Sequence, residues 1–494
     1  MMSRIVLAFV CLLWMCSAST AAQTPSSSQG ACAPEACPVL TLDAVLEQVV
    51  RTNPEARAFR LEADRAQAEL LDARGGFDPY LSANYEYKTD DAKDKLNVLR
   101  SGMTVPFDVW MSPRLTLDYR RGLGSSVDPS VVTDPEGETR FGVAVLPLQG
   151  LGLDKRRAAL RKARLEPRRA DALQAEQQNR LVLDATAAFW TWVEARQTLQ
   201  IHRDLLTLAL QRRDFIVREA RAGEAAAMDS VEAELSVARR QGKVAVARRK
   251  ADEARIKLAV FLWDDDGAPE RFRYAPPTLP AAIAEREDRP GRAAADSAVA
   301  VRTALARRPE LRAVQVKARQ MRIERQLARQ QIRPDVKLEA QVVSYDSRPS
   351  ALNDVKLGFS ITQPLFFRSG RSEAERATIE TQAIRLKQEL LRRKVRADVK
   401  TALVALRQSR RRVALAVRRA NLAERLQVAE QRRFELGEST LFLVNQREQA
   451  FAEAQEERVA ARVALLQAAA TFRWATGTIA DGMGIRSGSV PGAR

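Results

Sequence analysis

The chain has 494 residues and a formal net charge of +18 at pH 7, because its 80 Lys and Arg outnumber its 62 Asp and Glu. With a single histidine, 4 cysteines, no nucleophile elbow and no phosphate-binding loop, we expect no enzyme, no cofactor and no metal site. Basic charge of this size is typical of a nucleic-acid or anionic-lipid partner, or of solvated helix faces. The export signal described next favours solvated faces.

The first residues have the pattern of an export signal. An apolar run over residues 5–15, followed by small residues up to Ala22, predicts a secretory signal peptide over residues 1–22. Cys16 raises the alternative of lipid attachment, but Trp14 and Met15 stand where that motif needs small side chains. Elsewhere the sequence has no apolar run of about 18 residues that would predict a transmembrane helix.

Residues 23–40 form an N-terminal tail that contains the cysteines Cys32 and Cys37. In an oxidising compartment this pair could close one small disulfide. Two free thiols in a frayed tail are the alternative.

A repeated pattern divides the rest of the chain. Asn53-Pro54-Glu55 ends one helical pattern and opens another, with proline in the first turn, and Arg308-Pro309-Glu310 repeats it 255 residues later. Pro79 and Pro334 have the same spacing. We therefore expect two tandem structural repeats.

The expected organisation follows from these landmarks. The first repeat comprises a helical region from residue 41, strands over residues 79–148, a long helix over 154–221 and a return helix over 226–263, and ends near residue 275. A proline-rich linker spans residues 264–297. The second repeat, residues 298–477, comprises a helical region, strands over 335–363, a long helix over 370–435 and a return helix over 440–475. Residues 478–494 are expected to be a disordered tail.

The two long helices carry matching heptad seams, in which each second-half position is 214 residues after its first-half counterpart. A seam sustained over four heptads predicts helices packed in coiled-coil fashion, and its alanines predict close approach. At 1.5 Å per residue each helix would be about 100 Å long. We expect each to end at a glycine in the left-handed conformation, Gly223 and Gly437. The seams are Leu181, Ala185, Ala188, Trp192, Ala195, Leu199, His202, Leu206 and Ala209, and Val395, Val399, Ala402, Leu406, Ser409, Val413, Ala416, Ala420 and Ala423.

Between the helices, apolar and polar residues alternate with a period of two. The alternation is clear over residues 80–88, 114–120, 335–342 and 355–362. Segments of roughly 9 residues with one apolar face match the strands of a transmembrane β-barrel. A half-buried sheet in a soluble protein would have the same pattern.

The first repeat carries 38 more residues between its landmark prolines than the second, because Pro147 follows Pro79 by 68 residues and Pro364 follows Pro334 by 30. The surplus includes two strand-like segments, residues 98–105 and 114–120. They form either an added hairpin or a surface loop with strand character, and we favour an extension outside the membrane.

In their order and duplication these features resemble the TolC-like outer membrane efflux protein family, over nearly the whole chain after the signal peptide. The resemblance rests on the paired helix starts at Pro54 and Pro309, on Gln363-Pro364-Leu365 before the second long helix, and on the helix ends at Gly223 and Gly437. It implies an α+β membrane protein, in which a long α-helical coiled-coil barrel continues into a transmembrane β-barrel closed by a homotrimer.

The resemblance also implies a role. Such a channel lies in outer membrane lipid, projects its helices into the periplasm and exports substrates in efflux or type I secretion. Its helix tips bind a periplasmic adaptor, the membrane fusion protein, which links it to an inner-membrane transporter. The residues implied at the adaptor-binding tips are Ala222, Gly223, Glu224, Leu436, Gly437 and Glu438.

Two acidic residues follow the first tip. In the family, acidic residues just beyond the tips line the periplasmic mouth and help to hold it closed, and Asp229 and Glu232 are the candidates here. Their i, i+3 spacing puts both on one helix face. The matching second-half residues, Leu443 and Gln446, are uncharged, and a solvated position outside the mouth is the alternative.

A basic coiled-coil protein with a structural or nucleic-acid-binding role is the second candidate function. It would need a cytoplasmic location and leaves the strands unexplained, so we expect no nucleic-acid partner.

Overall fold

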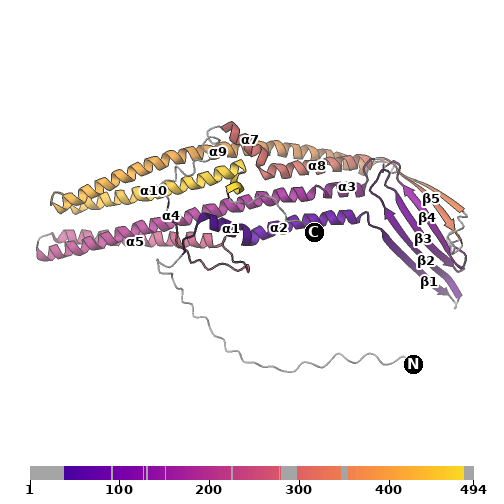
Figure 1. Cartoon of the computed structure of the whole chain (residues 1–494), viewed down its shortest axis with the longest axis horizontal. Coiled ribbons are helices and arrows are strands. Elements are labelled where there is room, and N and C mark those ends of the chain that lie inside the picture. Colours follow the sequence, from indigo (N-terminus) through magenta and orange to yellow (C-terminus); the bar gives the residue numbers. More distant parts are fainter. Residues whose placement is uncertain are drawn as a thin grey trace, which may run out of the picture.

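The computed structural model describes residues 38–90, 93–125, 127–128, 132–148, 150, 152–223, 226–277, 279, 297–345, 354–363 and 365–482. These residues form an elongated molecule with long helices over most of its length and one sheet at an end (Figure 1). The expected signal peptide, Cys32, Cys37 and Glu224 lie outside the described residues. Within the described ranges, no helix is both long and apolar enough to cross a membrane.

The sheet is an antiparallel meander of six strands in sequence order. Four strands come from the first half of the chain and two from the second, so the sheet joins the two halves at this end of the molecule. They are β1 (Tyr80–Asp90), β2 (Lys93–Pro106), β3 (Arg114–Leu123), β4 (Glu138–Val145), β5 (Asp335–Ser344) and β6 (Asp354–Thr362).

One face of this sheet is apolar across all six strands in the rows nearer the helices, whereas the next row outward on that face is mixed: Ala83, Ser101, Tyr119, Thr139 and Ser344. Following the strand pairing from β1 to β6, one row runs through apolar residues only: Leu81, Met103, Leu117, Phe141, Val342 and Val355. The adjacent positions point to the other face and are largely polar, as the period of a strand requires. They include Ser82, Thr104, Asp118, Arg140, Gln341 and Lys356. The alternation expected from the sequence is therefore present and is kept in register from strand to strand.

The surplus segments of the first half are full members of this sheet. Residues 98–105 lie in β2 and residues 114–120 lie in β3, and these strands pair with each other and with β1 and β4. The interpretation of this segment as a surface loop is therefore wrong, and the added hairpin is the arrangement observed. Its strands carry the same apolar alternation as their neighbours, which favours pairing over a loop.

The first half contributes five helices: α1 (Leu42–Thr52), α2 (Pro54–Gly75), α3 (Lys155–Ala163), α4 (Glu166–Ala222) and α5 (Ala227–Ala259). The expectation of one uninterrupted helix over residues 154–221 is wrong, because the chain breaks between α3 and α4. Pro167, in the first turn of α4, has no N–H to donate, and its ring would clash with the carbonyl of Ala163. The return helix is also shorter than expected and ends at Ala259.

The second half contributes α7 (Ser297–Arg307), α8 (Pro309–Gln330), α9 (Arg368–Glu435) and α10 (Leu441–Thr476). The sequence boundaries of these helices agree with the expectation within a few residues. The tail expected to be disordered begins with a 3₁₀ turn, η1 (Ile479–Gly482), in which Ile479 is buried and Asp481 pairs with Arg307. That part of the expectation is wrong.

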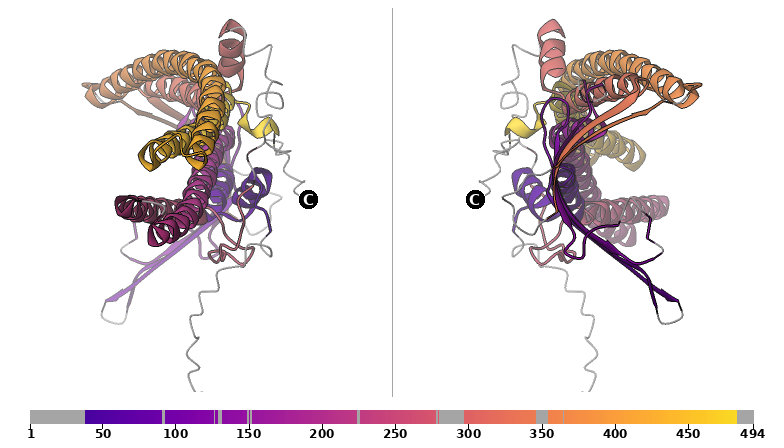
Figure 2. Two further views of the ribbon diagram at one scale, coloured as in Figure 1. Left: turned by 90° about the vertical axis from the view of Figure 1, so that its left-hand side faces the viewer. Right: turned by 90° about the vertical axis from the view of Figure 1, so that its right-hand side faces the viewer.

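Both heptad seams are buried or half-buried along their length. Helix α4 packs along α5 and helix α9 along α10, and α4 and α10 join the two pairs. The four helices form an open arc rather than a closed bundle (Figure 2). His202 is buried on its seam, as predicted.

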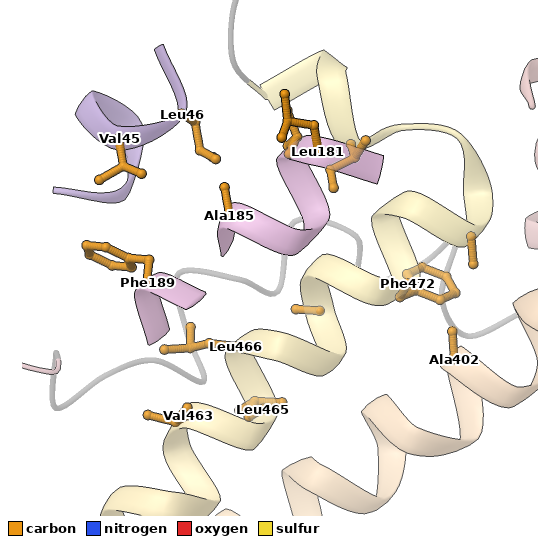
Figure 3. Close-up of a cluster of buried hydrophobic side chains, with 14 of the residues drawn as sticks. Val45, Leu46, Leu181, Ala185, Phe189, Ala402, Val463, Leu465, Leu466 and Phe472 are labelled. Carbon is orange, nitrogen blue, oxygen red and sulfur yellow. The ribbon is translucent and has the colours of Figure 1, made fainter. Parts of the chain in front are cut away.

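The largest buried cluster lies about midway along the helices, where α1 and α7 pack against the long ones. Val45 and Leu46 of α1 face Phe189 and Ala185 of α4, and α10 closes the other side with Leu466 (Figure 3). Edge-to-face contacts continue this core through Trp192 to Phe272 of the segment after α5. The first part of the expected linker is therefore packed. Just before it, the carbonyl of Trp263 accepts a hydrogen bond from Gln48 of α1 at 2.9 Å.

The two proline-containing helix starts are formed differently. Asn53 caps α2 by accepting a hydrogen bond from the N–H of Glu55, with Pro54 in the first turn. Arg308 occupies the matching position before α8 but makes no such cap. Its buried guanidinium instead pairs with Glu310 and Asp398 and lies over the ring of Trp474. It thereby ties α8 to both α9 and α10.

Candidate functional site

The candidate site is the end of the molecule farthest from the sheet, where both helix pairs turn back. Gly223 has φ 82° and Gly437 has φ 76°, so both adopt the left-handed conformation that was predicted. At the second turn the N–H of Glu438 donates to the carbonyl of Arg433 at 2.9 Å and the N–H of Gly437 to that of Phe434 at 3.0 Å. A Cβ at either glycine would meet nothing within 4 Å, so the backbone conformation alone demands glycine.

Apolar side chains are exposed around these turns. Leu436 is 68% exposed, and residues just beyond the turns on α5 and α10 are exposed to a similar degree: Met228, Val231 and Phe442. Ala222 ends α4 and is also exposed. An exposed apolar patch on a long helical projection is typical of a surface that contacts another protein.

The two candidate acidic residues lie in the first turns of α5, and both are half-buried. Glu232 faces α10, because its carboxylate accepts a hydrogen bond from the amide of Asn445 at 3.4 Å. Asn445 also accepts from the hydroxyl of Ser236 at 3.3 Å. Glu232 therefore lies between the two helix pairs, while the position of Asp229 relative to a pore stays a prediction.

A second carboxylate, Glu430, fastens the turn between α9 and α10. It is buried and accepts a hydrogen bond from the hydroxyl of Ser439 at 2.6 Å. Arg433 and Arg447 lie 3.7 and 3.8 Å from its oxygens. These contacts hold the start of α10 against the last turns of α9.

A buried ion cluster lies farther from the tips and joins all four helices. Glu448 of α10 is fully buried, and its carboxylate lies 2.5 Å from Arg212 of α4 and 3.7 Å from Arg240 of α5. Arg212 also donates to Gln431 of α9 at 2.8 Å. Burial lowers the pKa of Arg240, an effect that Glu448 opposes and Arg212 reinforces. Two cations thus share one buried carboxylate. Separating the helix pairs here would leave these charges buried without a partner or expose them to solvent.

Sequence reasoning missed this cluster, although a signal was present. Leu205, Ala209 and Ile216 of α4 are buried at helical spacing, and Arg212 stands between them. On α10 Glu448 likewise interrupts a row of apolar positions. A charged residue on a buried helix row needs a partner of opposite charge, and finding one on another helix required the structure.

His202 makes a further contact between the helix pairs. Its Nε2 lies 3.1 Å from a carboxylate oxygen of Glu456 on α10. The hydrogen bond from His202 lowers the pKa of Glu456 below its ordinary value of 4.5; burial opposes this, and Lys243 and Lys250 of α5 reinforce it. No group of three or more His, Cys, Asp or Glu that could hold a metal ion occurs among the residues that the structure covers.

Comparison with known proteins bears on both the family and the fold. Residues 300–478 match the family described as outer membrane efflux protein. This match lies within the second half of the chain and confirms the resemblance drawn from the sequence. No curated protein is significantly similar to the chain.

Solved structures extend the likeness to both halves. The outer-membrane channel OprN is 17% identical, with a TM-score of 0.64, over 88% of this chain and 89% of that one. The outer membrane protein VceC of Vibrio cholerae is 15% identical, with a TM-score of 0.64, over 88% and 96%. The outer membrane channel CmeC of Campylobacter jejuni is 12% identical, with a TM-score of 0.61, over 89% and 86%. At these identities the similarity establishes the fold.

The ion cluster gives a direct prediction for stability. Glu448→Gln removes the buried negative charge and leaves Arg212 and Arg240 facing each other, so we expect unfolding to become easier by about 3–5 kcal/mol. Glu453→Gln, an exposed change on the same helix, should stay within about 0.5 kcal/mol. Chemical unfolding in detergent, followed by circular dichroism, measures both. Equal stability of the two variants would show that the cluster does not hold the helix pairs together.

The contact between His202 and Glu456 predicts a dependence on pH. The pKa of Glu456 is lowered in the folded chain. The contribution of Glu456 to stability is therefore complete above pH 4.5 and is lost as the pH falls through the lowered pKa. The difference in unfolding temperature between the natural chain and Glu456→Gln should therefore shrink from about pH 6 to about pH 3. A difference that stays constant over this range would contradict the assignment, and Glu453→Gln again serves as the control.

Proposed function

We propose that this chain, whose residues 300–478 match the outer membrane efflux protein family, is one subunit of a homotrimeric channel through the outer membrane. The sheet lies in the membrane and the helices project into the periplasm. Three copies enclose one continuous conduit, through which substrates leave the cell in efflux or type I secretion.

The apolar face of the sheet carries this proposal. It runs through all six strands, and its side chains are open to solvent in the single chain: Leu81 is 79% exposed, Phe359 67% and Leu357 79%. Such a face suits contact with lipid, and the polar face behind it suits a water-filled lumen. A sheet in lipid must close on itself, because an open edge leaves backbone groups without hydrogen-bond partners.

The order of the strands supports closure by further copies. β1 and β6 are the end strands of the sheet, so each has one neighbouring strand within the described chain. β1 runs away from the helices and β6 runs back towards them, so β6 of one copy can pair antiparallel with β1 of the next (Figure 1). Six strands are too few to enclose a conduit, and additional copies supply the rest.

The helices also present apolar surface that a neighbouring copy would cover. In the chain α4 and α10 lie between α5 and α9, so α5 and α9 form the two ends of the helical arc (Figure 2). Large apolar side chains are exposed on both. They are Val231, Leu235, Val246 and Ile256 on α5, and Ile379, Leu386, Leu390, Val404, Leu415, Leu422, Leu426 and Val428 on α9. Pairing α5 of one copy with α9 of the next would bury both rows.

We assign the exposed tips to partner proteins. Leu436 and Phe442 beyond α9, and Met228 after Gly223, present apolar surface at the periplasmic end. A periplasmic adaptor protein that contacts an inner-membrane transporter is the partner that this position fits. The tips Ala222, Gly223, Glu224, Leu436, Gly437 and Glu438 remain the proposed binding residues.

The decisive experiment is the oligomeric state and activity of the chain purified from membranes. We expect a trimer by light scattering in detergent, recovered from the outer membrane fraction, because the sheet edges and the two ends of the helical arc both need neighbours. The trimer should conduct ions in planar bilayers. A stable monomer would contradict the proposal.

The acidic residues beyond the first tip lead to a prediction about selectivity. If three copies arrange Asp229 and Glu232 around the periplasmic mouth, the ring attracts cations, and salt screens the effect. Asp229→Ala with Glu232→Ala should therefore reduce the cation preference of single channels at low salt. Glu234→Ala, an exposed carboxylate on the same helix, is the matched control. Unaltered selectivity in the double variant would place both residues outside the mouth.

A further inference from the structure

The hairpin inserted in the first half has consequences for the width of the channel. By the repeat spacing, β1 corresponds to β5, since Tyr80 and Asp335 each follow the landmark proline, Pro79 or Pro334. β4 corresponds to β6, since each ends shortly before the second landmark. Strands β2 and β3 are therefore the insert, and two repeats without it would supply four strands to each copy.

We propose that three copies close a barrel of eighteen strands, with β2 and β3 spanning the membrane like the other strands. This inference rests on the proposed function. It assigns the insert to the lipid-facing wall of the conduit rather than to a structure at the cell surface, and it makes the two neighbouring copies of the chain the partners of the two sheet edges, one at β1 and the other at β6.

The faces of the inserted strands support this. Met103 in β2 and Leu117 in β3 continue the row between Leu81 and Phe141, and Val105 and Leu115 do the same in the next row. Arg120 of β3 points to the opposite face, where it pairs with Glu138 of β4. From Leu115 to Tyr119 the insert thus separates a largely apolar from a polar face in the same register as the strands on either side, and Arg121, nearer the outer end of β3, is a charged residue on the apolar side.

The turn between β2 and β3 is fixed to the junction of strands and helices. The N–H of Met111 donates to the carbonyl of Gly150 at 3.2 Å, and the N–H of Leu146 donates to the carbonyl of Met111 at 2.9 Å. Ser112 donates to Asp154, the residue that caps α3. Both turn residues have positive φ, 65° and 46°, a strained conformation that persists only where surrounding contacts hold it.

The same contacts lower the pKa of Asp154, the carboxylate that caps α3. Burial alone would raise the pKa of Asp154, but the hydrogen bonds from Ser112 and Arg157 outweigh it and leave the pKa below its ordinary value. The carboxylate that starts α3 is therefore shared with the inserted hairpin. The insert is built into the base of the sheet.

The stagger of the strands gives the tilt of the wall. Followed from strand to strand through the paired residues, Tyr80 at the helix end of β1 lies level with Lys356 of β6. The helix end of β6 is Thr362, six residues farther along that strand. This offset corresponds to about 20 Å along the strands over about 24 Å of sheet width, a tilt of about 40°. Tilts of about 35–45° are those of closed membrane barrels.

The ring of helices below the sheet requires a similar circumference. Four helices of each copy, α2, α3, α8 and α9, adjoin the sheet (Figure 1). At 8–10 Å between neighbouring axes, twelve helices occupy roughly 96–120 Å. Eighteen strands at this tilt occupy about 113 Å, and twelve would occupy about 75 Å. The insert therefore lets the strand ring match the helix ring.

Two measurements test the inference on the complete trimer. The first is the width of the barrel in projection by electron microscopy, with the natural chain. We expect about 36 Å between opposite backbones, about 1.5-fold the width of about 24 Å that twelve strands would give at the same tilt. A trimer with the narrower barrel would overturn the inference and leave the proposed function intact, whereas a monomer would contradict the proposed function itself.

The second measurement locates the contact between copies, in a background with Cys32→Ser and Cys37→Ser. Ala83→Cys on β1 is combined in turn with Leu357→Cys, Phe359→Cys and Ile361→Cys on β6, which together cover the registers that the stagger allows. Oxidation should yield covalent dimers and trimers on denaturing gels for at least one pair.

The control replaces Ala83→Cys with Ser101→Cys, which lies opposite Ala83 on β2 and is one strand farther from the edge. We expect no covalent oligomer from it, because β1 separates β2 from the neighbouring copy. Cross-linking from position 101 rather than from position 83 would show that β1 is displaced from the wall, and would overturn the eighteen-stranded arrangement.

Discussion

The need to pair every backbone group in an apolar solvent is the constraint on which this architecture depends. A six-stranded meander satisfies its internal pairs but leaves the outer edges of β1 and β6 open, and its apolar face of Leu81, Leu117 and Leu357 is exposed. In water such a sheet would aggregate through its edges. In a membrane the same edges require closure, and closure requires copies of the chain. The proposed oligomer is thus a consequence of the strand count rather than an addition to it.

The helices meet a different requirement, because they lie in water and must bury apolar rows against one another. Heptad seams supply most of this packing, and the alanines at Ala185, Ala402 and Ala420 allow close approach. Where α4, α5, α9 and α10 meet, the packing is interrupted by the charges of Arg212, Arg240 and Glu448. Replacing such a cluster with apolar residues is often neutral or stabilising, so its presence is better explained by specificity or by movement than by stability. A contact that is costly to break and lies about three helical turns from the tips suits a mouth whose closed state must be well defined.

Much of this fold follows from the sequence alone. Period-two alternation located the strands, heptad spacing located the seams, and glycines located both turns with their left-handed backbone. The misses have physical causes. Pro167 was overlooked within a strong helical pattern, although its missing N–H ends the preceding helix at Ala163. The surplus segments were left open between an added hairpin and a surface loop, and an extension outside the membrane was favoured, because a strand's pattern reports its faces and not its neighbours. Register and neighbours depend on pairing between distant segments, as does the link between Arg212 and Glu448.

In the proposed trimer, the inserted hairpin also changes where the conduit is narrowest. In that arrangement its strands widen the membrane wall without adding helices, because β2 and β3 are joined by a turn whose Ser112 donates to Asp154, the cap of α3, instead of by a helical pair. The helical tips, with Glu232 between the helix pairs and Glu430 fastening the second turn, are unaffected by that widening. In that trimer the tips are then the candidate restriction on what passes. Selection of cargo would depend on the opening of the tips and on the proteins bound there, while the strands provide an exit wide enough to impose no further choice.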